Sequence, residues 1–591
     1  MRKLFVLLLI TVAGVDGPRA SGLGPRTHRP ETRALSEARG PRPEAWVEKT
    51  LKAMTLDEKV GQLLIPTVTG GFRNTESDDF QKLRHDVIDL HVGGYHTFGG
   101  DAAGVASLLN DLQRMAKIPL LTTADMEGGA GYIIVGATRF PLAMAIGATG
   151  NEDFAYEAGK ATAEEGRMLG VNVDFYPVVD VQNNPGNPII NIRSFGEDPA
   201  RVSAFAVAYL KGVQDGGMLA TAKHCPGHGD VATDSHLEMP VLNVDRARLD
   251  SLELKPFRAA IDAGVGAVMS AHINIPSIEP EKGLPSSLSR NVLTGILRDE
   301  LKFGGLIFTD AMTMHAITSN YKDDDASVRA VLAGADIILH PPNPDASFNA
   351  IKAAVQSGKI PMARIDESVR RILQTKARLG LDKYKSTDVN GIGSVVGSKV
   401  HRDLSQQISD AAVTLVRDDR NVLPLAPSAD KRVLHINLLD NRTGWREGAV
   451  GKVTAAEIQK RFPKAITFQF DDGTTKNEFD MARRMADLVD AIVITAFIRV
   501  AAYKGTIDLS QEQLRFLRDL SAMQKPFVFA LFGSPYLLHH VPELPSYILT
   551  YDVNPGSEMS AIRAITGEIP FRGKLPISLP GLYAVGHGLT R

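Results

Sequence analysis

Short apolar runs alternate with longer amphipathic segments along the first two thirds of the chain, from Glu44 to about Leu381. Such runs are typical of parallel strands buried on both faces, and the amphipathic segments are typical of the helices that return the chain. Strands are predicted at 61–68, 92–98, 119–127, 173–181, 218–225, 267–273, 305–310 and 336–340. Helices are predicted between them, for example at 152–169, 198–216, 246–263 and 291–301. This alternation predicts a TIM-type (β/α)8 barrel with insertions.

A second region begins at about His401. Apolar runs at 411–416, 432–439, 491–497, 527–532 and 547–551 again alternate with helical segments. These runs are too few for a second barrel and predict a smaller, open α/β sandwich. The polar and glycine residues of 383–397 mark the boundary. We therefore expect a barrel at 44–384, a linker at 385–400 and a sandwich domain at 401–591.

The N-terminus has the pattern of an export signal. A cationic start is followed by an apolar run from Leu4 to Val15 and then by small and helix-breaking residues, which predicts a secretory signal peptide at 1–21. The run is shorter than the roughly 20 residues that span a bilayer, which favours a cleaved signal over an uncleaved anchor. Residues 22–43 are rich in Arg, Pro and Gly and predict a flexible spacer. The protein is expected to be secreted or periplasmic, with no membrane span after signal removal.

Composition narrows the class of protein further. A hydrophobic fraction of 44% and a net charge of −2 are typical of a soluble globular protein. Charges are mixed along the chain without a basic stripe, so nucleic acid is not an expected partner. Cys225 is the single cysteine, which excludes an internal disulfide and, because it lies far from the signal, a lipoprotein anchor.

Polar and ionisable residues gather where the predicted strands end. Barrel enzymes build their active sites at the C-terminal ends of the strands. The residues concerned lie at 125–129, 191–199, 223–236, 270–272 and 308–312. A barrel with only a structural role would not concentrate such groups at one end, so an active site is expected there.

The motifs at these strand ends resemble those of a known enzyme family. They are Lys-His-x-Pro-Gly-His-Gly at 223–229 with Asp-Ser-His at 234–236, Arg-Ser-Phe-Gly-x-Asp-Pro at 193–199 and Thr-Asp-Ala-Met at 309–312. In this order they resemble glycoside hydrolase family 3, in its NagZ-type β-N-acetylhexosaminidase branch. The resemblance implies a retaining β-N-acetylglucosaminidase. Such an enzyme removes terminal non-reducing β-linked N-acetylglucosamine from glycan or peptidoglycan fragments through a covalent glycosyl-enzyme, with a carbohydrate as its partner and no metal or other cofactor.

The resemblance also implies roles for individual residues. Asp310 matches the nucleophile, although an isolated Asp after a strand is as often a helix N-cap. His236 matches the general acid/base and Asp234 its partner. A neighbouring carboxylate fixes the tautomer of a histidine that titrates near pH ~6.5. For Asp-Ser-His alone, a surface turn would be the simpler interpretation.

Four further residues match sugar-binding positions of the family: Asp125, Arg193, Lys223 and His224. A buried Lys–Asp pair is the structural alternative for any one of them. His228 and Asp230 are expected to serve loop folding, and His272 is expected to be a hydrogen-bonded histidine at a strand end.

The sequence departs from the family pattern at three positions. Ala130 and Ile133 stand where arginines are usual, so a basic contact to the distal groups of the substrate is either missing or supplied from elsewhere. Cys225 stands where Phe is usual, which is expected to alter packing rather than chemistry.

Four alternatives stay open on the sequence. His224, His228, His236, Asp230 and Asp234 include types of residue that bind zinc, although their spacing and the irregular loop speak against it. A histidine acid/base does not repel phosphate as a carboxylate would, so a phosphorylase on the same scaffold is an alternative. An inactive glycan-binding homologue is the third. A β-glucosidase or β-xylosidase is the fourth, but it would give the Asp-Ser-His loop no purpose.

Overall fold

The computed structural model describes residues 43–383, 386–441, 443–444 and 450–591. The predicted signal peptide and nearly all of the predicted spacer therefore lie outside the described residues. Residues 43–591 form one compact unit. Within the described ranges, no helix combines the length and the apolar character that a bilayer crossing requires.

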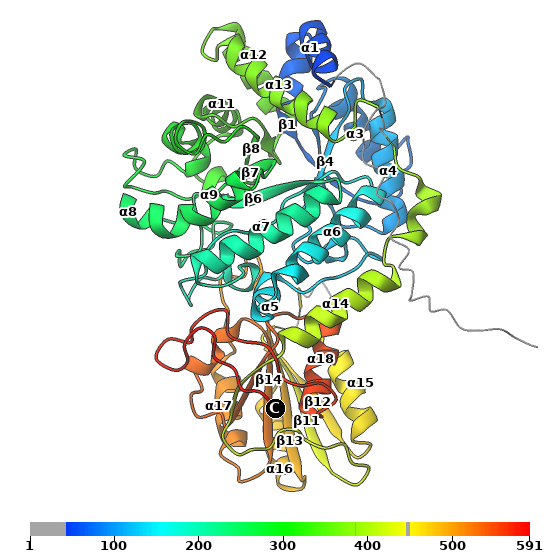
Figure 1. The fold of residues 1–591 in the computed structure, drawn as a ribbon, viewed down its shortest axis with the longest axis vertical. Coiled ribbons are helices and arrows are strands. Elements are labelled where there is room, and N and C mark those ends of the chain that lie inside the picture. The colour runs from blue at the N-terminus through cyan, green and yellow to red at the C-terminus, as the bar shows by residue number, and fades with distance from the viewer. Residues whose placement is uncertain (1–42, 384–385, 442, 445–449) are drawn as a thin grey trace, which may run out of the picture. The chain divides into compact units, whose positions relative to one another are not determined.

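The first part of this unit is a parallel barrel (Figure 1). Seven strands follow each other in chain order: β2 (Thr67–Thr69), β3 (Gly94–Phe98), β4 (Leu121–Ala124), β5 (Val173–Asp174), β6 (Leu219–Cys225), β7 (Ala267–Ser270) and β8 (Leu306–Thr309). β9 (Ile338–Leu339) pairs with β1 (Leu64–Ile65), which leads directly into β2. A bridge from Phe308 to Ile337 joins β8 to the start of β9 and closes the ring. The predicted TIM-type barrel is confirmed, and each predicted strand contains an observed one.

Burial explains why the barrel strands could be predicted from the sequence. β6 is buried at every position, as a strand covered on both faces must be. Two predicted helices are confirmed as α6 (Glu152–Met168), capped by Asn151, and α7 (Pro199–Asp215), capped by Asp198. The predicted helix at 246–263 forms α8 (Arg246–Arg248), η3 (Leu249–Glu253) and α9 (Leu254–Asp262), and that at 291–301 forms η5 (Asn291–Glu300); η3 and η5 are π-helical. β5 is shorter than predicted, and Pro177, just beyond it, has no N–H to donate to a ladder.

The second part is a six-stranded α/β sandwich, as predicted. Its strand order is β10 (Thr414–Asp418), β15 (Ser546–Leu549), β14 (Phe527–Gly533), β13 (Ala491–Ile498), β11 (Val433–Leu439) and β12 (Ile466–Phe470), and only β10 runs antiparallel to its neighbour. Helices α15 (Lys452–Arg461) and α18 (Pro555–Ile565) pack on one face. Helices α16 (Lys476–Asp487) and α17 (Gln511–Ser521) pack on the other (Figure 1).

One strand of this part was missed, and another was predicted to begin too early. β12 was not predicted because it is an edge strand whose first residues, Ile466 and Thr467, are exposed. The strand expected at 411–416 begins only at Thr414, because α14 (Lys399–Ala412) continues to Ala412.

Hydrogen bonds fasten the sandwich to the barrel away from the strands. His401 of α14 bonds Glu165 of α6 through Nδ1 at 2.7 Å. The buried carboxylate of Asp552 accepts bonds from the backbone N–H of Leu142 at 2.8 Å and from Nη2 of Arg139 at 3.1 Å. The sandwich is therefore held against helix α6 and against the segment that follows β4.

Candidate active site

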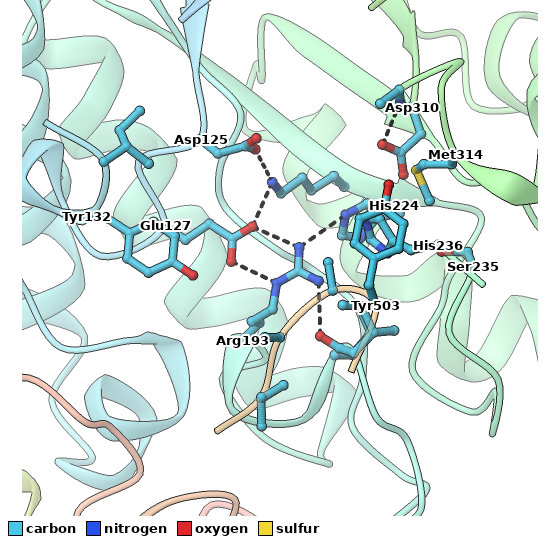
Figure 2. A pocket seen from close by; sticks show the side chains of 18 of the residues that line it. Asp125, Glu127, Tyr132, Arg193, His224, Ser235, His236, Asp310, Met314 and Tyr503 are labelled. Atoms are coloured by element: carbon cyan, nitrogen blue, oxygen red, sulfur yellow. Dashed lines mark hydrogen bonds and ion pairs between the residues drawn. The ribbon is translucent and has the colours of Figure 1, made fainter. Parts of the chain in front are cut away.

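A pocket of about 510 Å³ opens at the C-terminal ends of the barrel strands (Figure 2). Six of the seven residues predicted from the sequence line it: Asp125, Arg193, Lys223, His224, His236 and Asp310. The seventh, Asp234, is buried and directly bonded to His236. Figure 2 shows Asp125, Glu127 and Arg193 on one side of the pocket, and Asp310 with His236 on the other.

Asp310 directly follows β8, with its carboxylate at the pocket. Its backbone N–H donates to the carbonyl of Ser270 at 3.1 Å, and its Oδ1 accepts from the N–H of Ala311 at 2.8 Å. Burial would raise the pKa of the Asp310 carboxyl, but His224, His272 and His236 together outweigh it and lower this pKa. The next helix, α10 (His315–Thr318), is capped by Met314, so Asp310 is not a helix N-cap.

Asp234 and His236 form a hydrogen-bonded pair. Asp234 Oδ1 lies 2.7 Å from Nδ1 of His236 and also accepts the backbone N–H of His236 at 2.9 Å. The Asp234 side chain is 0% exposed and that of His236 is 23% exposed, so the carboxylate lies behind the ring. Burial would raise the pKa of Asp234, but its bonds to His236 lower it. Because Nδ1 is engaged, Nε2 is the ring nitrogen left to face the pocket.

An ion-paired network forms the opposite wall. Lys223 Nζ lies 2.6 Å from Oδ1 of Asp125 and 2.7 Å from Oε1 of Glu127. Arg193 donates two bonds of 2.8 Å to Glu127, one from Nε and one from Nη2. Burial opposes ionisation, yet Lys223 and His96 hold the pKa of Asp125 well below its usual range. The network therefore presents fixed charges, the geometry that sugar hydroxyls need for directional hydrogen bonds.

His224 is oriented by Asp180, which lies near the C-terminal end of the predicted strand 173–181. Its Nδ1 lies 2.7 Å from Oδ2 of Asp180, and its Nε2 lies 3.4 Å from Nη2 of Arg193. Asp180 also accepts the N–H of His228 at 2.8 Å. One buried carboxylate thus organises both histidines of the Lys-His-Cys-Pro-Gly-His motif.

Three contributors were not predicted. Glu127 lies inside a motif that was identified, but its role as the shared counter-ion of Arg193 and Lys223 needs the fold to be seen. Asp180 was identified only as part of a predicted strand. Tyr503, which lines the pocket from the sandwich, has no motif around it.

The departures from the family pattern have a structural setting. Ala130 is buried at 1% exposure, whereas Ile133 lines the pocket. Arg139 also lines it, held by Asp552, with its guanidinium 4.8 Å from the centre of the Tyr132 ring. A guanidinium is therefore present at the pocket, supplied from further along the chain than the usual positions.

The remaining polar residues of the motifs have internal partners. His272 is hydrogen-bonded through both ring nitrogens, to Ser287 at 2.6 Å and to the carbonyl of Ala311 at 3.0 Å, which agrees with the structural role expected for it. His228 Nε2 lies 3.1 Å from Oγ of Ser235, and Asp230 accepts a bond of 2.8 Å from Arg248. Burial raises the pKa of the Cys225 thiol, the opposite of what a nucleophilic thiol requires.

The residues weighed as metal ligands are engaged elsewhere. His224 uses Nδ1 for Asp180, and both oxygens of Asp234 accept N–H bonds. In the part of the chain that the structure describes, no group of three or more His, Cys, Asp or Glu side chains is arranged to hold a metal ion.

Comparisons of the sequence and of the structure with known proteins agree on one family. Residues 55–375 match the glycosyl hydrolase family 3 N-terminal domain. A β-N-acetylglucosaminidase/β-glucosidase of Cellulomonas fimi is 32% identical over 90% of this chain and 95% of its own. A glycoside hydrolase family 3 β-N-acetylglucosaminidase from Paenibacillus sp. FPU-7 superposes with a TM-score of 0.80 at 34% identity, covering 89% of this chain and 99% of its own. The β-glucoside phosphorylase BglX superposes with a TM-score of 0.81 at 29% identity, covering 92% and 97%.

Proposed function

The chain belongs to glycosyl hydrolase family 3 and is a glycoside hydrolase, and from this premise we propose that it is a retaining β-N-acetylglucosaminidase. The observation that carries the proposal is the meeting of three groups in one pocket. A strand-end carboxylate, Asp310, shares it with the acid/base pair His236 and Asp234, while the ion-paired wall around Lys223 faces them.

The first step forms a bond to the enzyme. The Asp310 carboxylate attacks the anomeric carbon, and the bond from this carbon to the leaving oxygen breaks. Protonated His236 gives the proton of Nε2 to that oxygen, so the leaving group departs as a neutral alcohol. The Asp234 carboxylate stabilises the imidazolium before transfer and keeps the proton on Nδ1 afterwards.

The second step reverses the roles. Neutral His236 takes a proton from water at Nε2, and the oxygen of that water attacks the anomeric carbon. The ester to Asp310 breaks and returns the carboxylate. Two displacements at one carbon retain the β configuration, which is why one histidine must serve as acid and then as base.

Substrate recognition falls to the ion-paired wall. Lys223 and Arg193 donate hydrogen bonds, and Asp125 accepts them, so hydroxyl and amide groups of one terminal sugar match this donor and acceptor set. His224, held by Asp180, adds a directed group between this wall and Asp310.

One assay tests the proposal. An aryl N-acetyl-β-glucosaminide and the matching β-glucoside are compared with and without inorganic phosphate. The N-acetylglucosaminide should be cleaved faster, and the first product seen by NMR should be the β anomer of the free sugar. Faster cleavage of the glucoside or an α anomer as first product would contradict the proposal.

A phosphorylase is the second candidate, because its acid/base would also be uncharged when phosphate enters and because BglX has a similar fold. Accumulation of a sugar 1-phosphate in the assay with phosphate would select it.

We also propose that the natural substrates are glycan or peptidoglycan fragments outside the cytoplasm, on the basis of the predicted signal peptide. Release of N-acetylglucosamine from muropeptides or chitin oligosaccharides by material from the secreted or periplasmic fraction supports this; activity confined to the cytoplasm contradicts it.

A further inference from the structure

The pocket is completed by the sandwich. Residues 499–505, here called the 499–505 loop, follow β13, and five of them, Arg499, Val500, Ala501, Ala502 and Tyr503, line the pocket together with barrel residues. A segment more than two hundred residues from Asp234 in sequence thus lies at the catalytic groups.

The loop touches the acid/base pair directly. The backbone N–H of Tyr503 donates to Oδ2 of Asp234 at 2.8 Å, the oxygen that His236 does not use. The Tyr503 ring stands edge-on to the His236 ring, with 4.9 Å between centroids (Figure 2). Tyr503 has a φ of +65°, a left-handed conformation that a large side chain rarely adopts. The loop must therefore be held in place by other contacts for this N–H to point at Asp234.

A buried ion pair supplies those contacts. Lys504, the next residue, is bonded to the carboxylate of Asp440 and donates to the carbonyl of Arg499 at 2.9 Å. The same carboxylate accepts the N–H of Arg499 at 2.9 Å, so it ties both ends of the loop. Asp440 directly follows β11 and its side chain is 0% exposed, while that of Lys504 is 8% exposed. Because such burial costs desolvation, an ion pair of this kind is a poor source of stability and a good source of fixed geometry.

We propose that the 499–505 loop, anchored by Asp440 and Lys504, positions the general acid/base of the barrel. Through the Tyr503 N–H it fixes the plane of the Asp234 carboxylate, which in turn fixes the ring of His236 with Nε2 toward the leaving oxygen. Tyr503, Lys504 and Asp440 are positioning residues, and the inference rests on the role proposed for His236.

The proposal follows from how much freedom Asp234 has without the loop. Its carboxylate is wholly buried, so an oxygen that loses the Tyr503 N–H has no ready water to replace it. The carboxylate would turn or take up a proton, and either change loosens its hold on Nδ1 of His236. Proton transfer would suffer, whereas attack by Asp310, which directly follows β8, would not.

The test removes the anchor without leaving a buried charge. Replacing Lys504 alone would strand the Asp440 carboxylate and endanger folding. The variant is therefore the double change Asp440→Asn with Lys504→Met. The matched control is Asp410→Asn with Arg563→Met, which removes another ion pair of the sandwich, 2.7 Å long, that does not touch the loop. Each is assayed on a dinitrophenyl N-acetyl-β-glucosaminide, which needs no acid assistance, and on the methyl glycoside, which does.

The anchor variant should lose about 10-fold or more in kcat/KM on the methyl glycoside and less than about 3-fold on the dinitrophenyl glycoside, since only the first needs general acid. The control variant should keep the wild-type ratio of kcat/KM on the two substrates. An unchanged ratio in an anchor variant whose melting curve shows it folded overturns the inference, provided His236→Ala changes the ratio in the same assay. If His236→Ala does not change it, the proposed acid role fails instead.

Tyr503→Gly separates the backbone from the ring. Glycine keeps the N–H and adopts the left-handed conformation easily, so the ratio of the two substrates should stay as in the wild type, whatever the lost ring does to KM. A change in the ratio of kcat/KM on the two substrates as large as that of the anchor variant would overturn the assignment of the positioning role to the backbone N–H.

Discussion

The strand-end groups and the loop groups of the pocket are held in different ways. Lys223 lies on β6, Asp310 directly follows β8 and Asp125 directly follows β4. Each has its partners within the barrel. His236 stands on a loop, and its partner Asp234 depends on an N–H from the sandwich. Lys223, Asp125 and Asp310 are thus fixed by the barrel, whereas His236, the proposed proton-transfer group, is fixed across two parts of the chain.

This difference suggests a division of labour. A nucleophile and a binding wall serve one position of the sugar throughout the reaction. The acid/base serves first a departing alcohol and then an entering water, which requires room to exchange them. A histidine on a loop gives that room, and a contact from another part of the chain restores its orientation.

The largest effect is expected at the strand end. Asp310→Ala removes the proposed nucleophile, so kcat/KM should fall by roughly 10⁴-fold or more for activated and unactivated leaving groups alike. Steady-state assays on the dinitrophenyl and methyl glycosides measure this. Near-wild-type turnover of either substrate would remove Asp310 from its role.

His236→Ala should reduce activity on the two substrates unequally. General acid help is worth roughly 10²–10⁴-fold, and only the poor leaving group needs it. The value of kcat/KM should therefore fall far more on the methyl glycoside than on the dinitrophenyl glycoside. Equal losses on both would place His236 with the binding wall instead.

Glu127→Gln tests the wall. It keeps the shape of the side chain but removes the charge shared by Arg193 and Lys223, so binding should weaken by about 10-fold for every leaving group. The informative quantity is the ratio of the two substrates, which should not move. A ratio that shifts as in the His236 variant would erase the distinction between the two sides of the pocket.

The smallest effect on catalysis is expected at His401, where a substitution should change stability instead. Bonds to Glu164 and Glu165 raise the pKa of His401 to about 9, from an unfolded value near 6.5. A raised folded pKa contributes stability that is fully present below the unfolded value and is lost as pH rises through the folded value. His401→Gln should thus destabilise the protein on the order of 2 kcal/mol at about pH 6 and hardly at all at about pH 10. Denaturant unfolding at the two pH values measures this difference; equal destabilisation at both would contradict it, and the kinetic ratio should stay unchanged.

The sequence predicts most of the barrel because its strands are buried on both faces. Every predicted barrel strand contains an observed one, because short apolar runs mark these buried strands even where polar residues such as Lys223 and His224 interrupt them. β12 lacks this signal because it is an exposed edge. The length of β5 was overestimated because an apolar run continues where Pro177 lacks the N–H that a ladder needs.

The site was predictable as far as motifs reach. Asp310, Asp234 and His236 lie in motifs and are brought to one pocket. Tyr503 could not be found in this way, because it acts on Asp234 through a backbone N–H that every residue except proline carries. Arg139 could not be found either, since its place at the pocket depends on Asp552, a distant residue of the sandwich.

The rate at which a thiol reagent labels Cys225 can report how often the catalytic end of the barrel opens. Cys225 is the single thiol of the chain, fully buried at the end of β6 beside His224. A thiol reagent can reach it only when the strand bearing Lys223 opens, so the labelling rate counts those openings. Bound substrate should slow the reaction, because a ligand that binds only the closed form reduces the time spent open. One chemical signal, without any introduced label, therefore reports how firmly the catalytic end of the barrel is closed.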